Sequence, residues 1–408
     1  MIFHKVKEKY LTMKSDTNYY KPSWASSMLS SQRITALDMA RFLAMIMMVQ
    51  GHTIDALASR DFLDIHFFPW NVWDFLRGFT AQIFLIVSGM VQVFANKRLE
   101  NGKLKPETIK KRITIATILI IIGYTLMFPA NNIWGLLILE QKDWLPFFQI
   151  NILQLIGVSL LMILATFLIT KNDKQLRYSA LIISLSIFIL SPLVHKINWF
   201  NILPEFLAAY LSFNHGSIFP IFPYTGFMFF GLFLGTLIKK ILPEKRTITL
   251  IKFFIPIGII LFITGHYIKT YFLDNFWVVH PKVNYGIIIY QIGFVMFCIG
   301  IISFIYTKTS KLSFYFALFG KRALMVYVIH LLLLYGSPWW PSIAHLYPQS
   351  LSLELTILAV IIIFILTFSI VYLYEYLLNT SPLFQKYYKK TLIITIAFLL
   401  LIGNFCRF

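Results

Sequence analysis

Residues 38–56 read DMARFLAMIMMVQGHTIDA and begin the first long apolar run of a 408-residue chain. As a helix, such a run is long enough to cross the roughly 30 Å of hydrocarbon in a membrane. The stretch nevertheless contains two aspartates, an arginine and a histidine. A charge in hydrocarbon is costly, so ionisable groups in a membrane helix mark a functional path by default.

The composition of the whole chain predicts a polytopic membrane protein. Hydrophobic residues make up 58%, aromatic residues 17% and charged residues only 13%, outside the usual range of soluble globular proteins. We expect an all-α membrane helix bundle of about eleven spans (10 to 12), of which the fourth and fifth are the weakest and residues 133–140 (IWGLLILE) are a re-entrant or interfacial alternative. The expected spans are 34–58, 70–96, 113–130, 146–170, 178–195, 217–238, 250–270, 285–307, 314–336, 353–379 and 391–406.

The distribution of basic residues predicts the topology of these spans. Cytoplasmic loops are rich in Lys and Arg, and a cytoplasmic N-terminus places 28 of the 36 basic residues in cytoplasmic segments, six in outer segments and Arg41 and Arg77 within spans. The C-terminus is then expected outside. The net charge of +19 therefore reflects topology and contact with anionic lipid in the bilayer, and we expect no nucleic-acid partner.

The chain divides into a cytoplasmic tail, residues 1–33, and one integral-membrane domain, residues 34–408. The tail has no compact apolar segment, so we expect no cleaved signal peptide. The two cysteines, Cys298 and Cys406, have no metal-ligand spacing and form no disulfide framework. With no His, Asp and Glu cluster at metal spacing, no metal is expected.

Four ionisable groups of the first span share one face of the helix. At about 100° per residue, Asp38, Arg41, His52 and Asp55 lie at relative angles of roughly 0°, −60°, −40° and −100°. Such a stripe should face the bundle interior or a water-filled cavity. The alternative is that Asp38 and Arg41 only pair near one membrane surface, while His52 packs near the other.

The second span, PWNVWDFLRGFTAQIFLIVSG at 69–89, repeats this theme. Asp74 and Arg77 are partners at i and i+3, and the alternative to a functional role is an ion pair that only fixes helix packing. Ser88-Gly89 could equally be a small-residue contact that lets two backbones approach. The loop SRDFLDIHFF before this span brings His66 close to the outer end of the first helix.

Two segments of the chain resemble a known family. LDMARFLAMIMMVQGH, in which an arginine precedes a histidine by eleven positions, followed by FLRGFTAQIFLIVSGM, resembles the transmembrane acyltransferase superfamily. Its branches include type 3 acyltransferases, which O-acetylate surface glycans, and bacterial relatives of heparan-alpha-glucosaminide N-acetyltransferase, to which this chain is closer. LFGKRALMVYVIHLLLL is similar to the family's Gly-Arg-aromatic-His helix and adds Lys321, Arg322, Tyr327 and His330. The resemblance covers residues 33–95, recurs at 318–335 and elsewhere rests on hydropathy.

The resemblance implies a catalytic histidine at one of two positions. The spacing from Arg41 matches the type 3 pattern at His52 without an insertion. The heparan branch instead places its histidine in the first outer loop before a Trp-Asn pair, which corresponds to His66 ahead of Trp70 and Asn71 with one extra residue between. Both histidines remain candidates.

A histidine suits the implied chemistry. Acyl transfer from a thioester requires removal of a proton from the attacking hydroxyl or amine, and an imidazole is a suitable general base near neutral pH. Asp55 could orient the ring of His52, as the acid does in a catalytic triad. The alternative for Asp55 is a hydrated carboxylate at the helix end.

The resemblance also implies acyl-CoA, with acetyl-CoA expected, as the donor. Guanidinium groups suit its phosphates, so Arg41 and Arg77, with Asp38 beside them, are the candidate donor-binding residues. Arg41 lies roughly 16 Å from His52 by helix rise, about the length that a phosphopantetheine arm must cover. The candidate acceptor-binding residues are Trp70, Asn71, Asp74, Tyr327 and His330.

These observations favour a multi-pass acyltransferase of the bacterial inner membrane that moves an acyl group from acyl-CoA to a glycan or lipid-linked sugar at the outer face. The alternative is a transporter or flippase whose polar stripe lines a substrate or proton path. That class favours inverted repeats and broken helices in matching halves, and the sequence has neither. A membrane scaffold without catalysis is a third reading. N- or O-transfer and the oligomeric state, a homodimer included, stay open.

Overall fold

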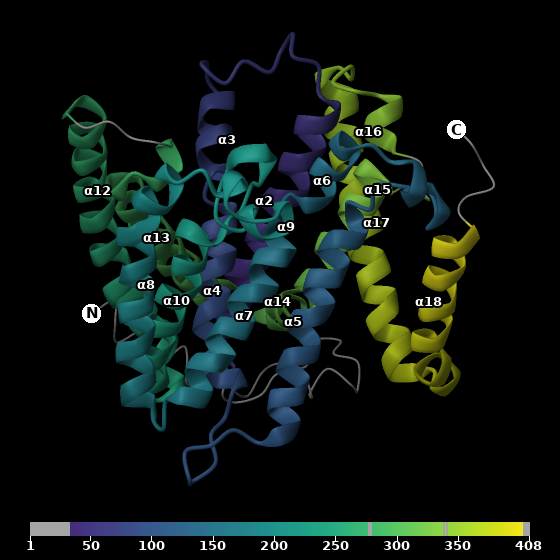
Figure 1. Ribbon diagram of the computed structural model, residues 1–408. Helices are drawn as coiled ribbons and strands as arrows, with labels where there is room; N and C mark the ends of the chain where they lie inside the picture. Colours follow the sequence, from purple (N-terminus) through teal and green to yellow (C-terminus); the bar gives the residue numbers. More distant parts are fainter. Residues whose placement is uncertain (1–32, 276–279, 338, 340–341, 403–408) are drawn as a thin grey trace.

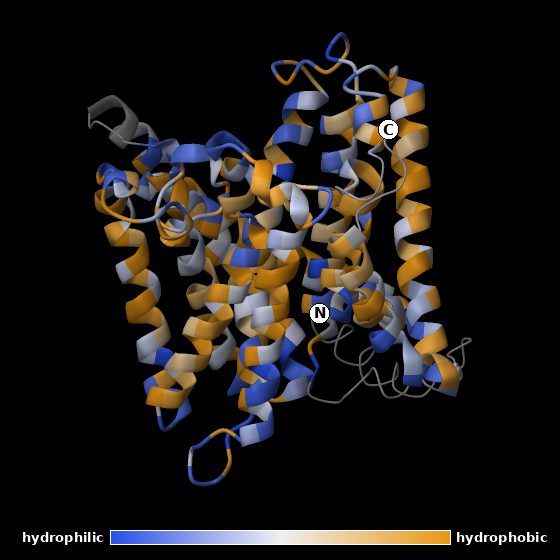
Figure 2. Ribbon diagram, turned by 45° about the vertical axis from the view of Figure 1, so that its right-hand side comes forward, coloured by the Kyte–Doolittle hydropathy of each residue, from blue (hydrophilic) through white to orange (hydrophobic). Residues whose placement is uncertain are grey.

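The computed structural model describes residues 33–275, 280–337, 339 and 342–402, and these form helices and loops with no strand among them. The helices stand side by side as a bundle, with α12 and α13 at one side and α17 and α18 at the other (Figure 1). Hydrophobic residues run along most of the length of these helices, and hydrophilic residues gather toward their ends (Figure 2). The all-helical class expected from the sequence is confirmed for the described residues.

The principal helices follow the apolar runs of the sequence. They are α2 (Thr35–Leu57), α4 (Thr80–Ala95), α5 (Pro106–Leu126), α7 (Ile152–Ile169), α8 (Asp173–Lys196), α10 (Ile221–Lys239), α12 (Ile255–Asn275), α13 (Tyr285–Thr309), α14 (Ser313–Lys321), α15 (Ala323–Tyr335), α17 (Leu353–Thr380) and α18 (Pro382–Ile402). Shorter helices connect them: α3 (Trp70–Arg77), α6 (Leu145–Phe148), α9 (Glu205–Ala208), α11 (Arg246–Thr249) and α16 (Ile343–Leu346), with further single turns such as η2 (Trp134–Ile138).

Among the described residues, seven helical segments are long and apolar enough to cross a membrane: Trp70–Ala95, Ile152–Ile169, Asp173–Lys196, Ile221–Lys239, Pro243–Tyr271, Tyr285–Lys321 and Leu353–Thr380. The protein is therefore a multi-pass membrane protein. Charged or polar residues interrupt the apolar runs of α2, α5 and α18, and α15 has only 13 residues. The count of about eleven crossings and the cytoplasmic N-terminus stay predictions. The last expected span, 391–406, ends outside the described residues, and 133–140 contains only the single turn η2.

Side-chain caps set the beginnings of three long helices. The side chain of Asn172 accepts the backbone N–H of Gln175 at the start of α8, and Asn284 accepts that of Gly286 at the start of α13. Ser352 does the same at the start of α17. Because a membrane offers no water to unpaired backbone groups, these caps satisfy donors that the first turn leaves open.

Close packing against α4 fixes the helices around the centre of the bundle. A Cβ atom on Gly89 of α4 would collide with the carbonyl oxygen of Met228 in α10, and one on Gly231 of α10 would collide with that of Ile86. Small residues permit such an approach of two membrane helices. The small-residue contact considered for Ser88-Gly89 is therefore confirmed at Gly89.

Helix α2 lies at the centre of the arrangement that matters for function. It contacts α4, α13, α14, α15 and α17. At its end, the backbone of residues 57–59 pairs with the segment before α17, through the Leu351 N–H to the Leu57 carbonyl at 2.9 Å and the Ser59 N–H to the Leu351 carbonyl at 2.9 Å. Both ends of α2 are thus held by distant parts of the chain.

Candidate active site

Helix α2 carries polar side chains at both ends and apolar ones between them. Asp38 and Arg41 lie in its first turns, and His52 and Asp55 in its last turns. The eleven residues from Arg41 to His52 place them about 16 Å apart along the axis.

At the first end, Asp38 pairs with Arg33 rather than with Arg41. The Arg33 Nε lies 2.5 Å from Asp38 Oδ2, and its Nη2 donates to Asp38 Oδ1 at 3.0 Å and to the carbonyl oxygen of Ala317 in α14 at 2.9 Å. Asp38 is only 4% exposed. The alternative considered from the sequence, a pair of Asp38 with Arg41 at i+3, is not what the structure has, because Arg33 reaches the carboxylate with two nitrogens. Asp38 instead ties the start of α2 to α14.

Arg41 is left with its Nε buried and without a hydrogen-bond partner among the described residues. It lines a cavity of about 340 Å³, which we call the Arg41 cavity. The cavity is lined by Arg33, Ile34, Leu37, Asp38, Arg41, Val91, Phe94, Ala95, Lys97 and Lys321. Four cations thus face a single carboxylate, and that carboxylate is already paired with Arg33, so the cavity has an excess of positive charge.

A buried glutamate beside this cavity was not anticipated from the sequence. Glu375 of α17 is 1% exposed, and its carboxylate accepts from Arg322 Nε at 2.6 Å and from Lys321 Nζ at 3.3 Å. The only signal was a carboxylate near the end of the long apolar run of α17. Since a buried charge needs a partner, Glu375 holds α17 to the junction of α14 and α15 and positions Lys321 at the cavity wall.

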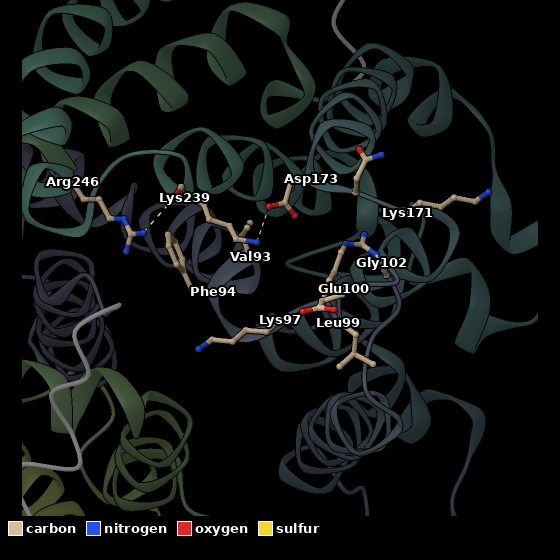
Figure 3. A pocket seen from close by; sticks show the side chains of 12 residues that line it. Val93, Phe94, Lys97, Leu99, Glu100, Gly102, Lys171, Asp173, Lys239 and Arg246 are labelled. Carbon is tan, nitrogen blue, oxygen red and sulfur yellow. Dashed lines mark hydrogen bonds and ion pairs between the residues drawn. The ribbon is translucent and has the colours of Figure 1, made fainter.

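A larger cavity of about 610 Å³ adjoins the first and shares Phe94 and Lys97 with it. Figure 3 shows its lining side chains, with Lys239 turned toward Asp173 at 2.7 Å. Arg98, also in the lining, donates to the carbonyl oxygens of Gly102 and Phe167 at 2.7 and 2.9 Å. Lys239 and the two terminal nitrogens of Arg98 are thus engaged by the protein itself, although the Arg98 Nε, like that of Arg41, is buried without a hydrogen-bond partner among the described residues.

At the other end of α2, His52 meets His330 of α15, and we call these two residues the histidine pair. His52 Nδ1 lies 3.1 Å from His330 Nε2, and the rings stack with centroids 5.3 Å apart. His330 Nδ1 lies 2.9 Å from the carbonyl oxygen of Val326 on its own helix. His330 is fully buried, while His52 is half-buried. A pair of imidazoles so linked can accept and hold a proton.

Two tyrosines of α15 complete the surroundings of the pair. The ring of Tyr327 lies edge-on to His330 with centroids 5.5 Å apart. The ring of Tyr335 lies 6.1 Å from that of His52, and its hydroxyl donates to the His52 carbonyl oxygen at 3.4 Å. The structure therefore brings Tyr327 and His330, both expected near the acceptor, to His52.

Arg77 joins α3 to the same end of α2. It forms ion pairs with Asp55 of α2 and with Asp74, the latter at 2.9 Å, and its guanidinium lies 4.4 Å from the centroid of the Trp73 ring. The expected Asp74 and Arg77 pair is confirmed. Of the two readings of Asp55, the structure has neither: Asp55 bonds to Arg77 and not to the ring of His52. Arg77 lies at the opposite end of α2 from Arg41.

The loop before α3 keeps the second histidine candidate apart from the pair. His66 is exposed, and its backbone N–H bonds to the Asp64 carboxylate at 2.9 Å. Its ring makes no hydrogen bond or ring contact with the described residues. Trp70 packs on Phe62, with ring centroids 5.6 Å apart, and Asn71 is exposed. His66, Trp70 and Asn71 thus form the rim at this end of α2, while His52 lies deeper.

Comparison with known proteins gives one match. The model of the family described as heparan-alpha-glucosaminide N-acetyltransferase, catalytic, matches residues 33–276. This range is more than half of the chain and includes Arg41, His52, His66 and Arg77, while His330 lies beyond it. No curated protein and no solved structure matches.

Proposed function

The chain belongs to the heparan-alpha-glucosaminide N-acetyltransferase catalytic family, and from this premise we propose that it transfers an acetyl group from acetyl-CoA to a sugar hydroxyl or amine. The family indicates a membrane acetyltransferase, and this favours an enzyme over the transporter alternative. The donor, the acceptor class and the placement in a bacterial inner membrane are our proposal. Acetyl-CoA would enter at the start of α2, and the acceptor would enter at its end.

One observation carries the proposal. A single helix presents a cavity with excess positive charge at one end and a histidine pair at the other, about 16 Å away by helix rise. An acyl-CoA is built in the same order, with phosphates at one end and a thioester at the far end of a flexible arm. The arrangement would hold the phosphates near Arg41 and deliver the thioester to His52.

The donor's phosphates are best accommodated in the Arg41 cavity. Arg41 has a buried Nε without a partner, and Lys97 makes no hydrogen bond or ion pair with the described residues. Guanidinium groups bind phosphate through several parallel hydrogen bonds. The larger cavity has more room and also includes Lys97, but its Arg98 and Lys239 already bond to protein groups. Arg41 is therefore the cation that favours the smaller cavity as the phosphate site.

The chemistry would take place at His52. Its Nε2 accepts the proton of the acceptor's hydroxyl or amine while that oxygen or nitrogen attacks the thioester carbonyl carbon. A new C–O or C–N bond forms and the C–S bond breaks. The leaving thiolate of CoA takes the proton back from His52, which restores the neutral imidazole.

The exposed rim would serve the acceptor. His66, Trp70, Asn71 and the tyrosine Tyr335 lie around the approach to the histidine pair. Aromatic rings with exposed faces suit the apolar faces of sugar rings, and side-chain amides suit their hydroxyls. We therefore assign His66 to acceptor binding and His52 to proton transfer.

The test is transfer of labelled acetyl from acetyl-CoA in sealed proteoliposomes, with amino sugars or neutral sugars as acceptors. His52→Ala should lower kcat by about 100-fold or more, while His66→Ala, the matched control in the loop, should mainly raise KM for the acceptor. Product analysis distinguishes an amide from an ester. Wild-type turnover by His52→Ala would reject His52 as the base.

A further inference from the structure

We infer that His330 is a positioning residue: it holds His52 in the single tautomer that leaves Nε2 of His52 free to accept a proton. The inference deepens the proposed function and rests on it for its effect on turnover. The tautomer itself can be observed without turnover.

The backbone of α15 determines which nitrogen of each histidine carries the hydrogen. The Val326 carbonyl oxygen can only accept a hydrogen bond, so His330 Nδ1, 2.9 Å away, must carry the hydrogen. A neutral imidazole has one donor and one acceptor nitrogen, which makes His330 Nε2 an acceptor. His52 Nδ1, 3.1 Å from it, is then the donor. The lone pair of His52 is left on Nε2.

A charged His330 would reverse this order, because both of its nitrogens would donate. The side chain of His330 is fully buried, and no carboxylate contacts it among the described residues. Burial of an unpaired charge is strongly unfavourable. The neutral form of His330, and with it the donor role of His52 Nδ1, is therefore the arrangement that the surroundings support.

The groups that face His52 leave His330 as its acceptor. Asp55 is engaged by Arg77, and the Tyr335 hydroxyl bonds to the backbone of His52 rather than to its ring. The ring of His330 is in turn fixed between the Val326 carbonyl and the edge of Tyr327. His52 thus has one ring partner, and that partner cannot rotate freely.

The pair would act at two moments of the reaction. Before transfer, the bond fixes the orientation of His52 and keeps Nε2 basic. After His52 has taken the proton, its Nδ1–H still donates to His330 Nε2, and this bond is stronger because the donor is now charged. The same two tasks belong to the acid of a catalytic triad, and here a neutral histidine would perform them.

Three substitutions separate positioning from general packing. His330→Gln can keep an acceptor oxygen near the place of Nε2, while His330→Asn keeps a donor near Nδ1 but does not reach His52, and His330→Leu keeps neither. We expect Leu and Asn to lower kcat about 10- to 100-fold with KM for acetyl-CoA unchanged, and Gln to retain most of kcat. Wild-type kcat in His330→Leu, or a Gln variant no better than Leu, would overturn the inference. Because Gln and Asn are both polar and similar in size, their contrast remains informative if the Leu variant folds poorly.

A second measurement does not depend on turnover. The protein is labelled with ¹⁵N-histidine, and the NMR signal of the His52 ring is identified by its loss in His52→Gln. This signal should be that of the Nδ1-protonated tautomer in wild type. In His330→Leu it should report a mixture of the Nδ1-protonated and Nε2-protonated tautomers. A wild-type His52 protonated on Nε2 would overturn the inference. The expected tautomer in a protein that transfers no acetyl group would uphold the hydrogen-bond order and reject the proposed function instead.

Discussion

Replacement of Arg41 by glutamine should remove the part of CoA affinity that comes from the phosphates. Arg41 is the cation of its cavity whose buried Nε has no partner in the described protein, so a phosphate would gain hydrogen bonds there that no protein group already occupies. Hydrogen bonds to a charged group contribute about 1.5 to 3 kcal/mol. At about 1.4 kcal/mol per tenfold change, the loss corresponds to a roughly 10- to 150-fold weaker Kd. The neighbouring Lys97 and Lys321 remain in place, which favours the lower half of this range.

The assay is calorimetric titration of purified protein in detergent with acetyl-CoA and, in parallel, with acetyl-pantetheine, which lacks the nucleotide. Wild type should bind acetyl-CoA more tightly, and Arg41→Gln should erase most of the difference without changing the affinity for acetyl-pantetheine. Arg60→Gln, an exposed arginine at the opposite end of α2, is the control and should keep the difference. Equal affinities of wild type and Arg41→Gln for acetyl-CoA would refute the reasoning, as would equal losses for both ligands.

Three further outcomes follow from contacts between the helices of the bundle. Arg77→Gln should lower the thermal midpoint of unfolding, because Asp55 and Asp74 lose their ion-pair partner. It should preserve the preference for acetyl-CoA over acetyl-pantetheine. Loss of that preference would place the phosphates of CoA at the Asp55 end of α2 instead. Glu375→Gln should destabilise the fold by about 1 to 3 kcal/mol in thermal unfolding, since Lys321 and Arg322 lose their shared carboxylate, and an unchanged midpoint would contradict this. Gly89→Ala should lower the free energy of unfolding by about 1 to 3 kcal/mol, because the added methyl group overpacks against α10. Gly51→Ala, where an added Cβ meets nothing within 4 Å, should not lower it. Equal stabilities of the two glycine variants would contradict the close contact.

The positions of the helices could be predicted from hydropathy because a membrane segment must satisfy its backbone groups internally. Each expected span falls on a helix within the described residues, although three of them are broken. The expected span 70–96 divides into α3 and α4, 146–170 into α6 and α7, and 314–336 into α14 and α15. At the first and last of these breaks a charged side chain bonds to another helix, Arg77 to Asp55 and Arg322 to Glu375. Hydropathy does not report such bonds, because the partners are far apart in the sequence.

The same distinction applies to the site. Helical periodicity correctly placed Asp38, Arg41, His52 and Asp55 along α2, since their angles depend only on spacing. Their partners depend on tertiary packing: His52 meets a residue 278 positions away. The local alternatives, an acid three residues from a histidine or from an arginine, were chemically reasonable. Instead, Arg33, directly before α2, bonds to Asp38, and Arg77 of α3 bonds to Asp55. The role of His330 beside His52 could not have been predicted without the packing of α15 on α2.

The continuous helix between Arg41 and His52 acts as a molecular ruler. One inserted residue would lengthen it by about 1.5 Å and turn one end by about 100° relative to the other, so the cationic cavity and the imidazole would no longer share a face. An insertion of a full turn would restore the face but add about 5 Å, which a phosphopantetheine arm of fixed length cannot supply. The spacing of these two residues would therefore select for one length of donor arm, independently of the side chains that contact it.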